Sequence, residues 1–265
     1  MSEDQKNKYG LSRYIPAEIR RIVRKRDGFG CVICGEAIFH YEHFNPEFKD
    51  ATEHNSDGIT LLCATHHDKK TRGLISKGDI SNAMNIPLPK ENGFAKTSIN
   101  LSNKSSPKIY MGGIEIRGLG CPFIFLNHPL IIIGKSDVIN APLLISASFY
   151  DSEGNLSLQI IENEYVLYSS NWDIEAIGGN PEKNELPRII IRERMKKIHL
   201  FLEIDVENSS IIVSTLITKI KNFLFEISRD EFFVTDLNTG MKHPIKIKGG
   251  IDLGNSGTNV GLCLG

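Results

Sequence analysis

Hydrophobic residues recur at helical spacing near the start of the chain and alternate with polar residues through much of its second half. Pro16 suits the first position of a helix. Ile19, Ile22 and Val23 then share one helical face, which predicts an amphipathic helix that runs to about Arg26. An Asp-Gly pair follows directly and ends this helix.

Shorter elements are expected after this helix. The segment around His43 is expected to supply two antiparallel strands, and residues 64–72 and 77–85 two helices, the second of which ends before Pro87. From residue 87 to 107 the composition turns to Pro, Asn, Lys, Ser and Gly, which is typical of a linker. The chain therefore divides into a head at residues 1–86, a linker at 87–107 and a second module at 108–265.

Alternation with a period of two marks the second module. Ile145, Ala147 and Phe149, for example, alternate with serines. Strands of this kind are expected at 114–117, 122–126, 129–133, 144–150, 156–160, 188–192, 198–204, 210–215, 223–227, 232–235 and 245–248. Many short strands separated by turn residues predict an antiparallel sandwich or a barrel-like module. The fold class is therefore α+β, with a small head followed by a mainly antiparallel, β-rich module.

The net charge of the whole chain does not indicate a nucleic-acid partner, because 31 Lys and Arg residues are balanced by 32 Asp and Glu residues. Local clusters are more informative, and they lie at 20–26 and at 69–72. A solvated helix face is the commoner explanation of such clusters. Because these two clusters adjoin the candidate site described next, we expect Arg20, Arg24, Lys69 and Lys70 to contact phosphates.

Three cysteines and one histidine have the spacing of a zinc knuckle: Cys31, Cys34, Cys63 and His66. Two close pairs of thiolate or imidazole ligands suit a closed tetrahedral Zn²⁺ site. Four protein ligands leave no open position for a substrate, so the zinc is expected to be structural. We expect the small head to depend on it for folding.

A second metal site is suggested inside the loop that the knuckle closes. Glu42 stands beside His43, and a spare histidine, His67, follows the last zinc ligand. A carboxylate plus one imidazole favours Mg²⁺ or Mn²⁺, and a neutral histidine suits general-base work. This combination predicts phosphodiester hydrolysis, with Glu42 and His67 as ligands and His43 as the base. His40 and His54 are interpreted as loop or strand histidines, and either is the alternative ligand if the register of the motif differs slightly.

Residues 31–34, 41–44 and 57–70 resemble the HNH endonuclease family, whose ββα-metal motif often lies on a zinc ribbon. The resemblance implies that His43 is the general base, Glu42 the acidic metal ligand, and His67 the last histidine. Where the family commonly has an asparagine that pins the loop, this chain has Gly58. Asp57 or Asn55 is the candidate substitute. The resemblance covers only the first quarter of the chain and makes the head a zinc-stabilised ββα-metal unit.

The expected function is a metal-dependent HNH endonuclease acting on nucleic acid, DNA in preference to RNA. A nuclease head with an accessory domain is the layout of restriction-type or phage-defence nucleases, in which the β-rich module serves targeting, sensing or oligomerisation. Its partners would be nucleic acid and either a second copy or a subunit of a defence complex. Two alternatives stay open. One is a non-catalytic zinc-ribbon binding module, and the other is an effector gated by a ligand or partner of the β-rich module.

Localisation is expected to be cytoplasmic. The first residues are polar, unlike a signal peptide, and no apolar run approaches the length of a membrane span. The two cysteines outside the zinc set, Cys121 and Cys263, are flanked by apolar residues and are expected to be buried thiols.

Overall fold

The computed structural model describes residues 6–246, 250–254 and 260–264 and divides into two compact units. The first unit comprises Met1–Thr97 together with Leu167–Ile174. The second comprises Ser98–Val166 and Glu175–Gly265. The first unit is thus discontinuous in sequence, because a short segment from the second half of the chain belongs to it.

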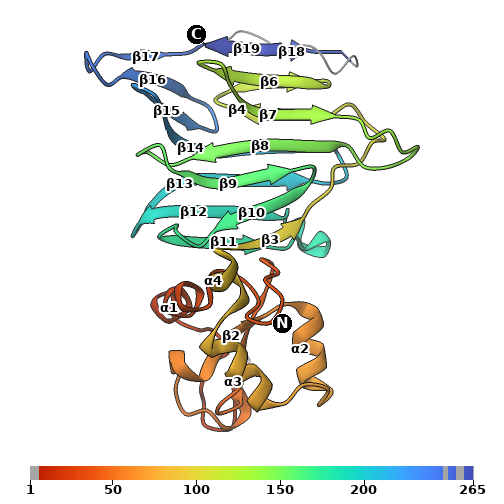
Figure 1. Cartoon of the computed structure of the whole chain (residues 1–265), viewed down its shortest axis with the longest axis vertical. Coiled ribbons are helices and arrows are strands. Elements are labelled where there is room, and N and C mark those ends of the chain that lie inside the picture. Colours follow the sequence, from red (N-terminus) through yellow and green to blue (C-terminus); the bar gives the residue numbers. More distant parts are fainter. Residues whose placement is uncertain (1–5, 247–249, 255–259, 265) are drawn as a thin grey trace. The chain divides into compact units, whose positions relative to one another are not determined.

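The first unit contains short helices and one small sheet (Figure 1). Its elements are α1 (Ala17–Asp27), β1 (His40–His43), β2 (Ile59–Leu62), α2 (Ala64–Thr71), α3 (Lys77–Asn85), α4 (Leu88–Asn92) and β3 (Phe94–Ser98). Single 3-10 turns lie at Phe48–Asp50 and Ser56–Gly58. The helices expected at 64–72 and 77–85 are therefore confirmed as α2 and α3.

Helix α1 forms as the sequence predicts. Pro16 precedes it, and Gly28 ends it in the left-handed conformation with φ of 76°. A side chain at Gly28 would also crowd Pro89, because an added Cβ would lie 3.0 Å from the proline Cβ. Three basic residues occupy the last turn of α1, where they complement the negative end of the helix dipole.

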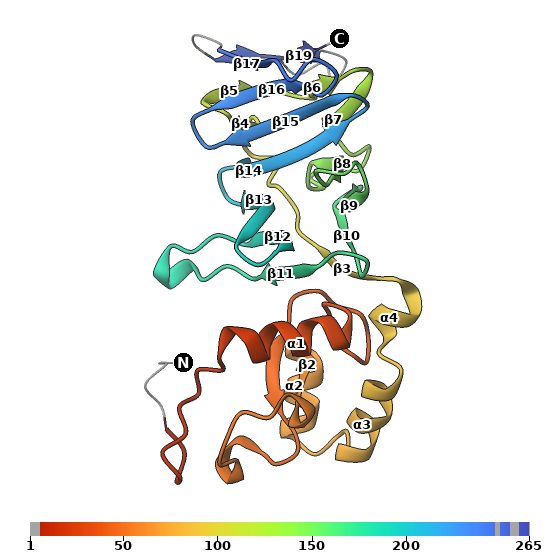
Figure 2. The ribbon, with the colours of Figure 1, turned by 90° about the vertical axis from the view of Figure 1, so that its left-hand side faces the viewer.

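Strands β1 and β2 pair antiparallel, with Glu42 opposite Thr60 and His43 opposite Ile59. Successive side chains of a strand leave opposite faces. The Tyr41 side of β1 packs with α1 residues, including Val23, and the other side meets α2 (Figure 2). The small sheet therefore lies between two helices and is followed directly by α2, which is the expected strand–strand–helix order.

The second unit is built from strands. These are β4 (Lys108–Met111), β5 (Ile114–Arg117), β6 (Gly120–Phe125), β7 (His128–Gly134), β8 (Leu144–Tyr150), β9 (Leu156–Ile161), β10 (Glu164–Tyr168), β12 (Arg188–Arg194), β13 (Lys197–Asp205), β14 (Ser210–Ile220), β15 (Phe223–Ser228), β16 (Phe232–Asp236), β17 (Lys242–Pro244), β18 (Ile251–Asp252) and β19 (Val260–Leu264). Strand β11 (Asp173–Ile177) spans the boundary between the units in the chain.

Two sheets of this unit face each other (Figures 1 and 2). Within the unit one sheet follows the order β19-β6-β7-β8-β9-β10, and the other the order β12-β13-β14-β15-β16-β17 with β4, β5 and β18 attached. Phe125 of β6 stacks on Phe225 of β15 with ring centroids 4.4 Å apart, and Phe232 of β16 lies 5.8 Å from Phe125. Aromatic side chains from both sheets therefore fill the core between them.

The structure confirms the expected type of fold for this module, which is rich in β-strands, because most of its strand pairs are antiparallel. Within the described residues, parallel pairing joins β4 with β14, β5 with β18, and β6 with β19. Ile245 and Lys246 are not in a strand, and the remainder of the strand expected at 245–248 lies outside the described residues. No helix of the described residues is long and apolar enough to cross a membrane.

The expected linker at 87–107 contains regular structure. Pro87 is the N-cap of α4, and Gly93 ends this helix in the left-handed conformation. Strand β3 follows, so the first compact unit continues to Thr97 rather than ending at residue 86.

Candidate functional site

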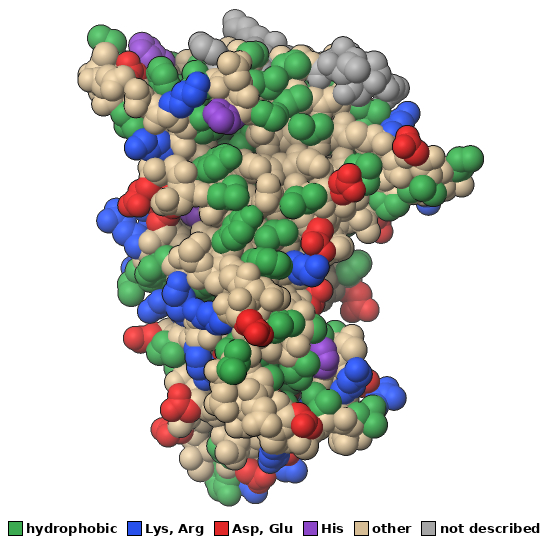
Figure 3. Space-filling model, in the orientation of Figure 1, with side chains coloured by type: hydrophobic (Ala, Val, Ile, Leu, Met, Phe, Trp, Pro, Cys, Tyr) green, Lys and Arg blue, Asp and Glu red, His purple; other side chains and the backbone are tan. Residues whose placement is uncertain are grey.

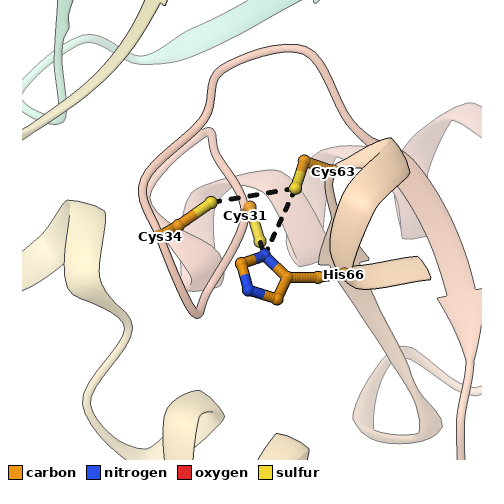
Figure 4. Close-up of side chains that lie close together, drawn as sticks. All are labelled: Cys31, Cys34, Cys63 and His66. Carbon is orange, nitrogen blue, oxygen red and sulfur yellow. Dashed lines mark hydrogen bonds between the residues drawn. The ribbon is translucent and has the colours of Figure 1, made fainter. Parts of the chain in front are cut away.

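The four predicted zinc ligands converge in the first unit (Figure 4). The Nδ1 atom of His66 lies 3.4 Å from Cys31 Sγ and 3.3 Å from Cys63 Sγ, and the sulfur atoms of Cys34 and Cys63 are 3.7 Å apart. All four ligand atoms lie within 4.8 Å of one another. We call this set the thiolate–imidazole cluster. Its size and its donors fit a tetrahedral Zn²⁺ ion.

The local fold explains why the cluster closes. Gly35 adopts a positive φ of 80°, and its N–H donates to the Cys31 carbonyl, which folds the knuckle back on itself. Cys63 is the N-cap of α2, directly after β2, and its carbonyl accepts from the N–H of His67. The second ligand pair therefore sits on the first turn of a helix.

The electrostatics of the knuckle favour a thiolate. A hydrogen bond from Cys34, together with nearby backbone N–H groups, lowers the pKa of Cys31 to about 5 although burial opposes this. The hydrogen bond to Cys31 and burial raise the pKa of Cys34. The deprotonated thiol is the form that binds a metal.

Glu42 and His67 are brought together beside the cluster. His67 Nε2 lies 2.9 Å from one carboxylate oxygen of Glu42, and Lys70 Nζ lies 2.8 Å from the other. The Glu42 side chain is nearly buried, and Lys70 also approaches Glu47 at 3.9 Å. The carboxylate of β1 is thus held by two side chains of α2. His40, on the same side of β1, places its ring 5.5 Å from that of His67.

His43 has a separate environment. It follows Glu42 directly in β1, so its side chain leaves the opposite face of the strand. Its Nε2 atom lies 3.0 Å from Nδ1 of His54, and its ring contacts the Phe48 ring at 5.4 Å. Burial, with smaller contributions from the neighbouring His54 and Arg13, lowers the pKa of His43 to about 4. The ring is therefore neutral at neutral pH.

The loop before β2 is held by Asn55 and not by the Asp57 side chain. The side-chain oxygen of Asn55 accepts from the backbone N–H of Asp57, while the Asp57 side chain is exposed. Gly58 is buried, and its carbonyl accepts from the N–H groups of Phe44 and Asn45. An added Cβ at Gly58 would lie only 2.1 Å from the Asn45 carbonyl oxygen, so a side chain at this position would require the backbone to shift.

The four basic residues that are expected to contact phosphates differ in whether their side chains are free to do so. Lys69 is exposed, whereas Lys70 is paired with Glu42. Arg20 is half-buried, with its guanidinium 5.3 Å from the Tyr14 ring centroid. Arg24 is only 3% exposed and forms a buried ion pair, so it is unavailable to a phosphate. Over the face shown in Figure 3, side chains of both charges are interspersed, in keeping with the balanced composition.

The partner of Arg24 was missed by sequence reasoning. Asp173 accepts from Arg24 Nε at 2.9 Å and from Nη2 at 2.7 Å, and the third guanidinium nitrogen donates to the Tyr41 hydroxyl at 2.7 Å. Lys25 donates to the Asn171 carbonyl beside it. The segment Leu167–Ile174 belongs to the first unit for this reason, and no local sequence signal identifies it.

The role of His54 was also missed, because a lone histidine in a loop gives no pattern. Outside the first unit, the remaining cysteines are less buried than expected, since Cys121 is half-buried and Cys263 is exposed.

The fold and the site define a protein with a small unit able to bind a metal and a larger unit of mainly antiparallel strands. Comparison of the chain with protein-family models, with curated proteins and with solved structures finds no match.

Proposed function

We propose that the first unit is a metal-dependent endonuclease of the HNH kind, which hydrolyses phosphodiester bonds in nucleic acid, DNA in preference to RNA. One observation carries the proposal: Glu42 and His67, from β1 and α2, meet at 2.9 Å, and His67 directly follows the cluster ligand His66 in the chain. A buried carboxylate next to an imidazole is costly to maintain in a unit of this size, and a metal-binding role accounts for it.

The Glu42–His67 pair fits a hard divalent ion with few protein ligands. Mg²⁺ and Mn²⁺ retain several waters, so one carboxylate oxygen and one imidazole nitrogen suffice. Such an ion, when bound, supplies positive charge to the nonbridging and leaving oxygens of the ester. Lys70 holds the other oxygen of Glu42, which fixes the orientation of the carboxylate.

His43 is the proposed base. His43 is the last residue of β1, and its side chain leaves the face opposite to Glu42, so the proposal requires a phosphodiester that passes across the end of this strand and reaches both faces. A water oxygen then bonds to phosphorus while His43 takes one proton from that water. The P–O ester bond breaks, and the leaving oxygen is protonated. His43 is neutral at neutral pH, which is the state that a base needs, but a pKa of about 4 makes it a weaker base than an ordinary histidine.

Incubation of the purified chain with plasmid DNA and with RNA, in Mg²⁺ or Mn²⁺, tests the proposal. We expect cleavage by the native sequence and a loss of at least about 100-fold in Glu42→Gln, His67→Ala and His43→Ala. His243→Ala, which changes an exposed histidine of β17, is the matched control and should cleave normally. Zinc content confirms that each variant is folded. Equal cleavage by all variants, or no cleavage in either metal, contradicts the proposal.

A non-catalytic binding module is the second candidate. The observation that favours it is that Lys70 and His67 already satisfy both oxygens of Glu42, so the group is also explained as a structural ion-pair cluster. Under this alternative the chain binds nucleic acid without cleaving it, and the affinity falls steeply as salt is raised. Under either alternative the β-rich unit is the part that would select or gate the substrate.

A further inference from the structure

A cavity of about 320 Å³ opens at one end of the second unit, a volume at the lower end of the range for small-molecule sites. Strand β7 pairs antiparallel with β8, so the start of β7 lies beside the end of β8 (Figure 1). The β8–β9 turn and the β14–β15 turn complete the walls, and the N–H of Lys219 donates to the Asp151 carbonyl at 2.9 Å across the two sheets. Most of the lining residues have polar side chains: His128, Tyr150, Glu153, Lys219 and Lys221.

The wall that the β8–β9 turn forms is held by its own hydrogen bonds. The Asp151 carboxylate accepts from the backbone N–H groups of Glu153 and Asn155, at 2.9 and 2.8 Å, and from the Asn155 amide at 3.0 Å. The N–H of Ser152 donates to the Glu193 carboxylate at 2.6 Å. The cavity therefore has its shape before a ligand binds, which reduces the entropy that binding must offset.

The polar side chains of the lining take no part in this network. Within the described residues, no hydrogen bond or ion pair is formed by the side chains of His128, Tyr150, Glu153, Lys219 and Lys221. Lys197, which also contacts the β8–β9 turn, is by contrast paired with Glu193. Two ammonium groups and one carboxylate give the lining a net positive charge, and a cavity of this kind attracts anions.

We propose that this cavity binds a nucleoside monophosphate. The two negative charges of a phosphate group match the ammonium groups of Lys219 and Lys221. An ionised Glu153 only accepts hydrogen bonds, so it favours a ligand that also carries hydroxyl groups, as a ribose does. Tyr150 and His128 supply aromatic faces on which a base can stack.

Inorganic phosphate fits this lining less well than a nucleotide does. It satisfies the two lysines, but it leaves the Glu153 carboxylate without a donor and close to a like charge. The proposal concerns the second unit alone and does not rest on the proposed nuclease function.

Isothermal titration of the full chain with adenosine, guanosine, cytidine and uridine monophosphates, in buffer without phosphate or divalent metal, tests the proposal. We expect saturable binding of at least one of them below about 1 mM, and much weaker binding of the nucleoside without its phosphate. Lys219→Gln and Lys221→Gln should each weaken binding at least about 10-fold, the effect of losing a charged hydrogen-bond partner. Lys135→Gln, which removes an exposed lysine just after the far end of β7, is the matched control and should bind normally.

Glu153→Gln separates a nucleotide site from a plain phosphate site. Loss of the negative charge should tighten the binding of inorganic phosphate, whereas the nucleotide loses a charged acceptor, so the preference for the nucleotide over inorganic phosphate should fall. Circular dichroism shows that each variant is folded.

Three results would overturn the inference: no binding of any of these nucleotides, equal weakening in all the lysine variants, or equal affinity of the native chain for the nucleotide and for inorganic phosphate. Titration with a single-stranded oligonucleotide covers the other source of phosphate. If the oligonucleotide binds, the nucleotides do not, and Lys219→Gln and Lys221→Gln weaken that binding, the cavity holds a nucleic-acid strand and the proposal is wrong.

Discussion

The buried ion pair between Arg24 and Asp173 predicts a large and specific loss of stability in Asp173→Asn. The two side chains are 4% and 3% exposed, and the carboxylate accepts two guanidinium N–H groups, at 2.9 and 2.7 Å. The guanidinium cannot lose its proton in a folded protein. Removal of the carboxylate charge therefore leaves a desolvated cation without a counter-ion.

The expected magnitude follows from that uncompensated charge. Breaking a buried pair by removal of one partner costs about 3–5 kcal/mol. The asparagine side chain keeps one oxygen that can accept a hydrogen bond from Arg24. We therefore expect the free energy of unfolding to fall by about 3 kcal/mol, at the lower end of this range. With a urea dependence of about 1.5 kcal/mol per M, this corresponds to a fall of about 2 M in the unfolding midpoint.

Trp172 provides the assay. It is the only tryptophan of the chain, it precedes Asp173, and its ring lies 4.5 Å from the Arg21 guanidinium. Its fluorescence therefore reports on the first unit during urea unfolding.

The matched control is Asp68→Asn, which breaks a pair with Arg72 whose side chains are 56% and 69% exposed. Exposed pairs of this kind contribute at most about 0.5 kcal/mol. A loss below about 1 kcal/mol in Asp173→Asn, or equal losses in the two variants, would refute the reasoning from burial. The double variant Arg24→Met with Asp173→Leu should recover part of the loss, because an apolar pair leaves no buried charge.

Three further outcomes are expected. Removal of zinc by a chelator should unfold the first unit, measured by circular dichroism, because structural zinc contributes about 10 kcal/mol in small domains; an unchanged spectrum in the zinc-free chain would contradict this. The pKa of His43 is about 4 in the folded chain, against an ordinary value of 6.5. Between pH 4 and pH 6.5 the unfolded chain therefore binds a proton at His43 more readily than the folded chain does. Stability should therefore fall by about 1–2 kcal/mol as pH drops from 6.5 to 4, a dependence that His43→Leu should flatten in urea titrations. Gly58→Ala should cost about 1–3 kcal/mol, since its Cβ would lie 2.1 Å from the Asn45 carbonyl oxygen. Gly78→Ala in α3 should instead stabilise by about 0.5–1 kcal/mol, because its Cβ would make only an ordinary contact of 3.5 Å with the Ser76 hydroxyl oxygen.

Local signals were sufficient to predict α1, α2 and α3, whereas α4 and β3 lie in the segment that was expected to be a linker. Pro16 and Gly28 delimit α1, and Ser76 caps α3 with a reciprocal bond from Asp79, so both ends follow from neighbouring residues. The thiolate–imidazole cluster was predictable for the same reason, because ligand spacing is a property of short segments. The pairing of Glu42 with His67 required only the strand–strand–helix order.

Contacts between distant segments were not predictable from a single sequence. Arg24 belongs to a basic run that resembles a phosphate-binding face, yet its partner lies 149 residues away in the chain. The periodicity of a sequence shows which face of a helix is apolar. It does not show which acidic residue, far away in the chain, forms an ion pair with a buried arginine. His54 illustrates the same limit at short range, since its role depends on how the loop after β1 returns to His43.

The structural and the proposed catalytic metal sites are coupled through one turn of helix. Cys63 and His66 belong to the thiolate–imidazole cluster, and His67 follows His66 in α2. Once zinc fixes His66, the direction of the His67 side chain is determined by helix geometry. Glu42 is tied to the same frame, because β1 pairs with β2 and β2 leads directly into Cys63. Zinc bound in the cluster would therefore hold Glu42 and His67 in this arrangement, so zinc loss should separate this pair at the same metal concentration at which the first unit unfolds.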